Sequence, residues 1–315
     1  MVDIKDLFPI GIGAWGHGGF AEHNPDNDDE KQIRALTYQF NKGMNMTEIN
    51  FWNSKGHSVK LIKEALDRSK IGRDNIFLLQ SIYNYYNPTL DDVKREFELC
   101  LKTFATDHVD SIQFPLTAVK VYGFGPLTKL IQDYLDQKLT RYVSVTNFNL
   151  EYLTKFQSIF GSKIFSHELH FSFEIRNNED LGIIDFDNNH GIINVIYQPL
   201  RRNRTAKQNW PLLAELATKY SKTQNQIILR WLTSRGMLPL VKSEYIEHID
   251  ENLAALSFEM KKEGIERMNK FRPPNFVSKK IDWFMEGKIP NSAFIHALPN
   301  IFDEEYAKVL NSGKK

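Results

Sequence analysis

Short apolar segments alternate with longer amphipathic segments along most of the chain. The apolar segments span only a few residues and carry Val, Ile, Phe and Tyr, which is typical of parallel strands covered by helices. We therefore expect eight strands, at residues 10–15, 46–50, 76–82, 109–116, 142–148, 165–171, 193–200 and 238–243.

The intervals between these strands have the periodicity of amphipathic helices. In the first interval Ile33, Leu36 and Phe40 recur at spacings of three and four residues, which places them on one helix face. Gly43 follows and is suited to end this helix. The helices predicted in this way cover residues 29–42, 59–66, 91–103, 126–139, 212–220, 224–233 and 246–256.

Alternating strands and helices of this number fit a single α/β domain, a (β/α)8 TIM barrel. A doubly wound sheet is the alternative, and it normally carries GxGxxG after its first strand. The segment GIGAWGHGG contains this spacing at Gly11, Gly13 and Gly16, so the barrel is favoured by the eight strand–helix units and not by the glycines. The repeat stops near Phe271, and the remainder is rich in Pro, aromatic and turn residues. We predict a barrel at residues 1–270 and a C-terminal arm at residues 271–315 that packs on the barrel.

Charge and composition exclude several classes of partner. The chain has 40 basic and 39 acidic residues and a net charge of +1, without the basic face that nucleic acids or anionic membranes require. Its single cysteine, Cys100, excludes an internal disulfide, and no Cys/His spacing indicates a metal site. The first 20 residues do not read as a signal peptide, and no apolar run is long enough to cross a membrane. We expect a cytoplasmic protein.

Barrel enzymes place their sites at the C-terminal ends of the strands, and several motifs at these ends resemble those of the aldo-keto reductase family. Residues 10–15 resemble its opening LGxGTW, RYVSVTNFN at residues 141–149 its RxIGVSNF, and IYQPL at residues 196–200 its AYSPL. Residues 229–252 are similar to its ALRWLLQRGVVPIPKS followed by RIxEN. The resemblance extends from about residue 8 to about residue 270 and supports the barrel.

The resemblance implies that NADP(H) binds across the barrel mouth. Thr146 and Asn147 match positions that bind the nicotinamide carboxamide, with His167 beside them, and Tyr197 matches the aromatic ring that stacks on the nicotinamide. The positions implied for the rest of the cofactor are Leu200 and Arg201 at the pyrophosphate, Lys242, Ser243 and His248 at the 2′-phosphate, and Glu251 and Asn252 at the adenine.

The family's catalytic residues are an aspartate, a tyrosine, a lysine and a histidine, and the resemblance places different residues at these positions. Glu48 matches the aspartate, Asn53 the tyrosine and Ser81 the lysine, while Pro115 matches the histidine. Asn53 has no proton of useful pKa to donate, and Ser81 supplies no positive charge. We therefore expect that ordinary carbonyl reduction is disfavoured and that any acid–base chemistry passes through Glu48, with His57 as a further candidate.

Aromatic residues near the strand ends are expected to line a substrate pocket, namely Trp15, Trp52, Tyr83 and Phe114. Two functions stay open. The first is a divergent enzyme acting on a small apolar or carbonyl-containing molecule with NADP(H). The second is an inactive cofactor-binding sensor or partner subunit, which would bring a protein partner or a homo-oligomer with it. A barrel that no longer binds a cofactor is a third, weaker alternative.

Overall fold

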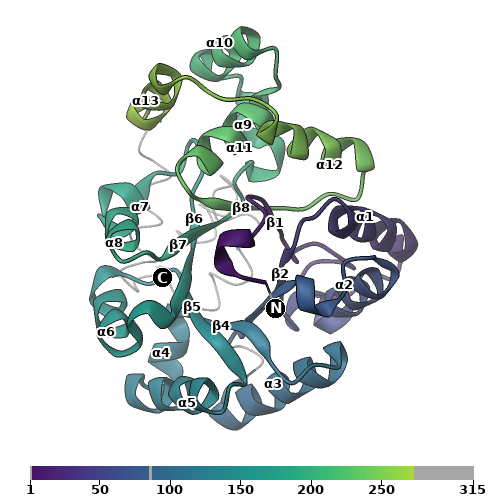
Figure 1. Cartoon of the computed structure of the whole chain (residues 1–315), viewed down its shortest axis with the longest axis vertical. Helices are drawn as coiled ribbons and strands as arrows, with labels where there is room; N and C mark the ends of the chain where they lie inside the picture. Colours follow the sequence, from purple (N-terminus) through teal and green to yellow (C-terminus); the bar gives the residue numbers. More distant parts are fainter. Residues whose placement is uncertain (1, 85–86, 273–315) are drawn as a thin grey trace, which may run out of the picture.

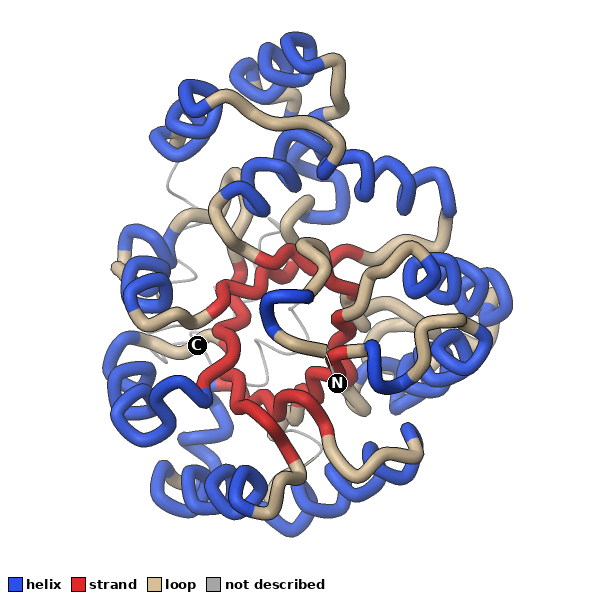
Figure 2. The backbone as a smooth tube through the Cα atoms, in the orientation of Figure 1, coloured by secondary structure: helices blue, strands red, loops and turns tan. Residues whose placement is uncertain are grey.

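Eight parallel strands close into one barrel in chain order, as Figures 1 and 2 show, and the computed structural model describes residues 2–84 and 87–272. Each strand pairs with the next along the chain, and the last pairs with the first. The predicted barrel is confirmed. Its strands are β1 (Gly11–Ile12), β2 (Met46–Ile49), β3 (Phe77–Ser81), β4 (Val109–Pro115), β5 (Thr140–Thr146), β6 (Ile164–His170), β7 (Ile193–Tyr197) and β8 (Leu238–Val241).

Helices surround the barrel (Figure 1), and the seven predicted stretches are helical. None of the helices in the described residues is long and apolar enough to cross a membrane. The helices are α1 (Asp29–Asn41), α2 (His57–Arg68), α3 (Leu90–Phe104), α4 (Leu116–Tyr122), α5 (Phe124–Asp136), α6 (Leu150–Phe160), α7 (Asn177–Asp180), α8 (Ile183–Asn189), α9 (Arg204–Gln208), α10 (Pro211–Tyr220), α11 (Gln224–Ser234), α12 (Ile246–Leu253) and α13 (Lys262–Lys270).

The N-terminal end of the barrel is filled by apolar side chains. The N-terminal segment lies across this opening (Figure 2), where Val2 is buried and Arg141 Nη1 donates to its carbonyl at 2.8 Å. Gly11 permits close packing here, because a Cβ at this position would lie 2.7 Å from Leu240 Cδ2. These side chains close the N-terminal end of the barrel, which leaves the C-terminal end for a site. The strand residues of this apolar cluster are Met46, Phe77, Leu79, Phe165, Val195, Leu238 and Leu240.

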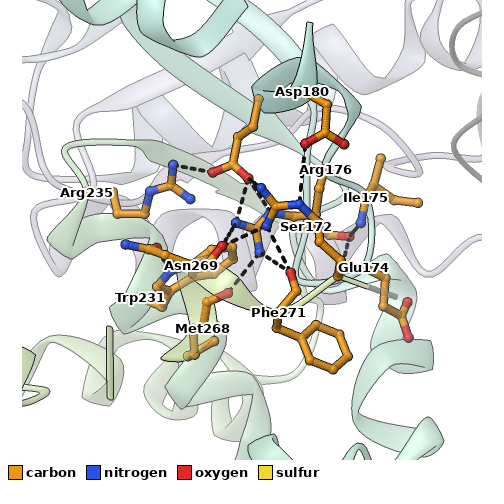
Figure 3. Close-up of polar contacts among 12 residues, drawn as sticks. Ser172, Glu174, Ile175, Arg176, Asp180, Trp231, Arg235, Met268, Asn269 and Phe271 are labelled. Atoms are coloured by element: carbon orange, nitrogen blue, oxygen red, sulfur yellow. Dashed lines mark hydrogen bonds and ion pairs between the residues drawn. The ribbon is translucent and has the colours of Figure 1, made fainter. Parts of the chain in front are cut away.

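The end of α13 is held on the barrel wall by a buried arginine, Arg176 (Figure 3). Its guanidinium donates to the carbonyls of Met268 at 3.0 Å and Asn269 at 3.1 Å, and it lies 4.8 Å from the ring centre of Trp231. A helix C-terminus leaves unpaired carbonyls, and this cation pairs with them. Of the predicted arm, Phe271 and Arg272 are described, and the rest lies outside the described residues.

Glu96 on α3 is a partly buried carboxyl whose ionisation should affect stability. Asn87 Nδ2 donates to its Oε2 at 2.7 Å, yet burial raises the pKa of Glu96 from 4.5 to about 7. The folded chain then holds this proton more tightly than the unfolded chain does. The resulting stabilisation is complete below pH 4.5 and is lost as the pH rises through about 7.

We expect Glu96→Gln to raise the free energy of unfolding at about pH 8 by up to about 3 kcal/mol, with the gain shrinking toward acid pH. Urea unfolding across this pH range measures the difference. Glu98→Gln, on the exposed side of the same helix, is the control and should change the free energy of unfolding far less. A gain from Glu96→Gln that is equal at all pH values would contradict the assignment.

Candidate functional site

A cavity of about 510 Å³ opens at the C-terminal ends of the strands. Its walls come from the loops that follow β1, β2, β3, β5, β7 and β8, so segments far apart in the sequence meet around one space. This is the end of the barrel at which enzymes of this architecture bind their ligands. Aromatic rings form part of the wall, and Trp15 stacks on Trp52 with the ring centroids 4.8 Å apart.

A flat ring and several hydrogen-bonding groups lie together on one side of the cavity. Tyr197 ends β7, and its hydroxyl donates to Asn147 Oδ1 at 3.3 Å. The ring of His170 stacks behind Tyr197 at 5.1 Å and fixes its plane. Asn147 adopts a left-handed φ of 53° just after Thr146 ends β5. This side suits a planar heterocycle with an amide substituent.

Cationic side chains from the loops after β7 and β8 line another part of the wall. Arg201 is buried and pairs with Glu174, which also accepts a hydrogen bond from Trp210 Nε1 at 2.6 Å. Arg202 lies over the ring of Phe20 at 5.1 Å. Lys242 Nζ lies 3.7 Å from Glu244 Oε2, and burial lowers the pKa of this lysine. Such a wall suits an anionic group. Arg201, Arg202 and Lys242 all line the cavity.

The cavity floor carries two buried carboxyl groups joined by a hydrogen-bonded chain. Glu48 comes from β2 and Glu168 from β6. Gln113 Nε2 donates to Glu168 Oε2 and also to Ser81 Oγ at 2.7 Å, and the Ser81 side chain bonds to Glu48. Thr146 Oγ1 donates to Glu168 Oε2 at 3.3 Å. The chain crosses the barrel interior and links both carboxyls.

Both carboxyls have raised pKa values. Burial raises the pKa of Glu48, and burial together with the neighbouring negative charge of Glu48 raises the pKa of Glu168 well above its ordinary value. Hydrogen bonds from Ser81 and Gln113 act in the opposite direction but are smaller effects. Two like charges in a buried site are unfavourable, so the pair retains a proton under conditions that ionise an exposed carboxyl.

The structure brings most of the predicted residues together around this cavity. Ser81 lies in the buried chain of the floor and does not line the cavity itself. His57 pairs with Asp29 away from it. The predicted residues that line the cavity are Trp15, Glu48, Trp52, Asn53, Tyr83, Thr146, Asn147, Tyr197, Leu200, Arg201, Lys242, Ser243, His248, Glu251 and Asn252.

Two residues that were predicted to line the cavity, His167 and Phe114, lie on the opposite faces of their strands. His167 is fully buried outside the cavity, where the Phe148 N–H donates to its Nε2 at 2.9 Å and its Nδ1 lies 3.1 Å from Asp187 Oδ2. Phe114 belongs to the core between barrel and helices. Side chains alternate along a strand, so the neighbours of these two residues, Glu168 and Gln113, point into the barrel instead.

A comparison with known families decides the relationship. The model of the Aldo/keto reductase family matches residues 9–273. The chain belongs to the aldo/keto reductase family. Its matched region covers the whole described barrel from just before β1 to just beyond α13.

Several members of the aldo/keto reductase family are similar over most of their length. The NADPH-dependent alpha-keto amide reductase of Saccharomyces cerevisiae is 27% identical over 66% of this chain and 69% of its own. Aldo-keto reductase AKR2E4 of Bombyx mori is 25% identical over 92% of this chain and 98% of its own. The crystal structure of the thermostable aldo-keto reductase Tm1743 with the inhibitor epalrestat aligns with a TM-score of 0.73 and 25% identity, covering 84% of this chain and 94% of its own.

The aldo/keto reductase barrel also presents cavity residues that the sequence interpretation missed. Glu168 is the main one, and the alternation of side chains along β6 would have separated it from His167. Phe20 and Gln198 also line the cavity, but they stand in loops where no periodic pattern indicates the direction of a side chain. Asn225 lines it from the first turn of α11.

Proposed function

We propose that this aldo/keto reductase transfers hydride from NADPH to the carbonyl carbon of a small, mainly apolar substrate, and that the buried carboxyl pair supplies the proton. The observation that carries the proposal is the presence of Glu48 and Glu168 on the floor of the same cavity that exposes Tyr197, Thr146 and Asn147. The yeast relative named as an NADPH-dependent alpha-keto amide reductase supports both the cofactor and a polarised carbonyl substrate.

The residues around the cavity fit NADP(H). Tyr197 would offer a flat face to the nicotinamide, and Thr146 and Asn147 would bind its carboxamide. Arg201 and Arg202 would face the pyrophosphate, and Lys242 the 2′-phosphate. Ser243 and His248 would complete the phosphate site, and Glu251 and Asn252 would flank the adenine, since all four line the cavity. When bound, NADPH supplies the hydride.

We infer that the four catalytic positions of the family are occupied here by Glu48, Asn53, Ser81 and Pro115. Of these, Glu48 and Asn53 line the cavity. An amide such as Asn53 donates a hydrogen bond but releases no proton at useful pH, so it can orient a carbonyl oxygen without protonating it. Without a lysine in place of Ser81, the Glu48 carboxyl is not held in its charged form.

Glu48 is therefore the proposed proton donor. As hydride reaches the carbonyl carbon, the carbonyl oxygen takes the proton of the Glu48 carboxyl, so that the ketone or aldehyde becomes an alcohol. The new carboxylate keeps the hydrogen bond from Ser81, and solvent entering through the cavity mouth returns the proton. Burial raises the pKa of Glu48, which favours its reprotonation.

Cofactor titration followed by turnover tests the proposal. We expect NADPH to quench the protein fluorescence with saturation, and NADPH to be consumed when α-keto amides, aldehydes or ketones are added. Saturable binding without consumption of NADPH by any carbonyl substrate would support an inactive cofactor-binding protein instead. Absence of binding would overturn the cofactor assignment as well.

A matched pair of lysine variants locates the cofactor. Lys242→Met should weaken NADPH binding by about 10- to 100-fold and NADH binding far less, because a charge-assisted contact to the 2′-phosphate is lost. Lys31→Met is the control, since Lys31 Nζ also lies near Glu244, at 3.5 Å, but does not line the cavity. Equal losses for NADPH and NADH in Lys242→Met would contradict the assignment.

A further inference from the structure

Two imidazoles and a carboxylate gather outside the cavity, where the loop after β1 meets the first turns of α1 and α2. His57 Nε2 lies 2.6 Å from Asp29 Oδ2, and the rings of His23 and His57 lie 3.9 Å apart. One ligand atom from each of the three side chains lies within 4.8 Å of the others. We propose that His23, Asp29 and His57 bind one Zn²⁺ ion.

The chemistry of the three side chains suits this ion. Zn²⁺ takes imidazole nitrogen and carboxylate oxygen ligands at about 2.0–2.2 Å in a tetrahedral arrangement. The 2.6 Å contact between His57 and Asp29 must widen by less than about 1 Å to admit the ion, and the exposed His23 side chain has room to turn toward it. Three protein ligands leave the fourth position for water.

Neighbouring groups already orient two of the three ligands. Asn27 Nδ2 donates to Asp29 Oδ1 at 2.5 Å, which leaves Asp29 Oδ2 for the histidines. Gln32 Nε2 in turn donates to Asn27 Oδ1 at 2.9 Å. Gly18 packs against the other side of His57, because a Cβ at this position would lie 2.5 Å from His57 Cδ2. Such outer contacts fix ligand geometry in metal sites.

The ion would fasten a wall of the cavity to the helices. His23 forms an isolated antiparallel β-bridge with Gly19, in the loop that also carries Trp15 and Phe20. Both of these aromatic residues line the cavity. Asp29 begins α1 and His57 begins α2. Zinc bound by all three would therefore restrain the loop on which the two aromatic residues stand.

Equilibrium dialysis of the full-length, tag-free chain against ZnCl₂ tests the site without cofactor or substrate. We expect one zinc ion per chain. His57→Gln and His23→Gln should each bind zinc at least about tenfold more weakly. Because His23 is exposed, its replacement should not unfold the chain, so weaker zinc binding in His23→Gln reports the loss of a ligand. His108→Gln is the matched control. His108 Nδ1 lies 2.6 Å from Asp107 Oδ1, but within the described residues this pair belongs to no three-ligand group.

Two further measurements sharpen the outcome. Co²⁺ in place of zinc should give the visible absorption of a tetrahedral site, and Mg²⁺ should not compete. Zinc should also slow hydrogen exchange of the loop around residues 16–24 in the wild type and not in the histidine variants. The proposal is overturned if the wild type binds no zinc, or if both histidine variants bind it as tightly as the wild type does.

Discussion

Glu48→Gln should lower kcat for carbonyl reduction by about 10²- to 10⁴-fold, because it removes the proposed general acid. The affinity for NADPH should stay within a few-fold of the wild type. The pH dependence supplies a second signature. Since burial raises the pKa of Glu48, wild-type kcat should be highest where this carboxyl is protonated and should fall as the pH rises through its raised pKa. Stopped-flow measurement of NADPH oxidation separates this chemical step from product release.

Glu96→Gln is the control for that experiment, because it makes the same chemical change at a carboxyl that does not line the cavity. Its kcat should match the wild type. Unchanged kcat in Glu48→Gln would exclude this carboxyl as the proton source, and a loss confined to Glu168→Gln would transfer the role to the second member of the pair.

Arg176→Met should lower the free energy of unfolding by about 3–5 kcal/mol, because it breaks a buried ion pair and leaves polar groups without their partner. Arg176 Nη2 lies 2.6 Å from Glu179 Oε2, and the same guanidinium donates to the carbonyls at the end of α13 (Figure 3). Burial lowers the pKa of Arg176 only to about 10, so the group stays charged at neutral pH. Urea unfolding measures the loss.

Arg267→Met provides the comparison, because Arg267 lies on α13, the helix whose end Arg176 contacts. Arg267 forms a bidentate pair with Glu215 at 2.5 and 2.6 Å, but this pair lies on the surface. Exposed pairs contribute little because water screens them, so its loss should be much smaller. Equal losses in the two variants would show that burial of the Arg176 cluster adds nothing to stability.

The barrel was predictable because the sequence shows both the hydrophobic periodicity of its helices and the short lengths of its apolar strands. Short apolar runs gave all eight strands, although β1 is reduced to Gly11–Ile12. Helix α6 (Leu150–Phe160) escaped prediction even though Asn149 caps it and accepts a hydrogen bond from the Tyr152 N–H at 3.0 Å. Leu153, Phe156 and Phe160 also recur at helical spacing and are buried, so the cap and the periodicity together could have identified this helix.

The site was predictable in position but not in its chemistry. Strand ends located the cavity, yet assigning His167 to it failed by one residue, and one residue reverses the face of a strand. The hydrogen-bonded connection between Glu48 and Glu168 passes through Ser81 and Gln113, which come from two further strands. No local pattern shows that four separated strands bring these groups into one hydrogen-bonded chain.

The pairing of Arg201 with Glu174 has a consequence for how the cavity attracts anions. This guanidinium reaches the wall with its charge already partly compensated by a buried carboxylate, which Thr205 Oγ1 and Trp210 Nε1 also hold at 3.1 and 2.6 Å. An arriving phosphate therefore gains less long-range attraction from Arg201 than from a cation facing solvent. Arg201 would favour orientation over affinity, and the steering of anions toward the cavity would depend mainly on the other basic side chains at its rim.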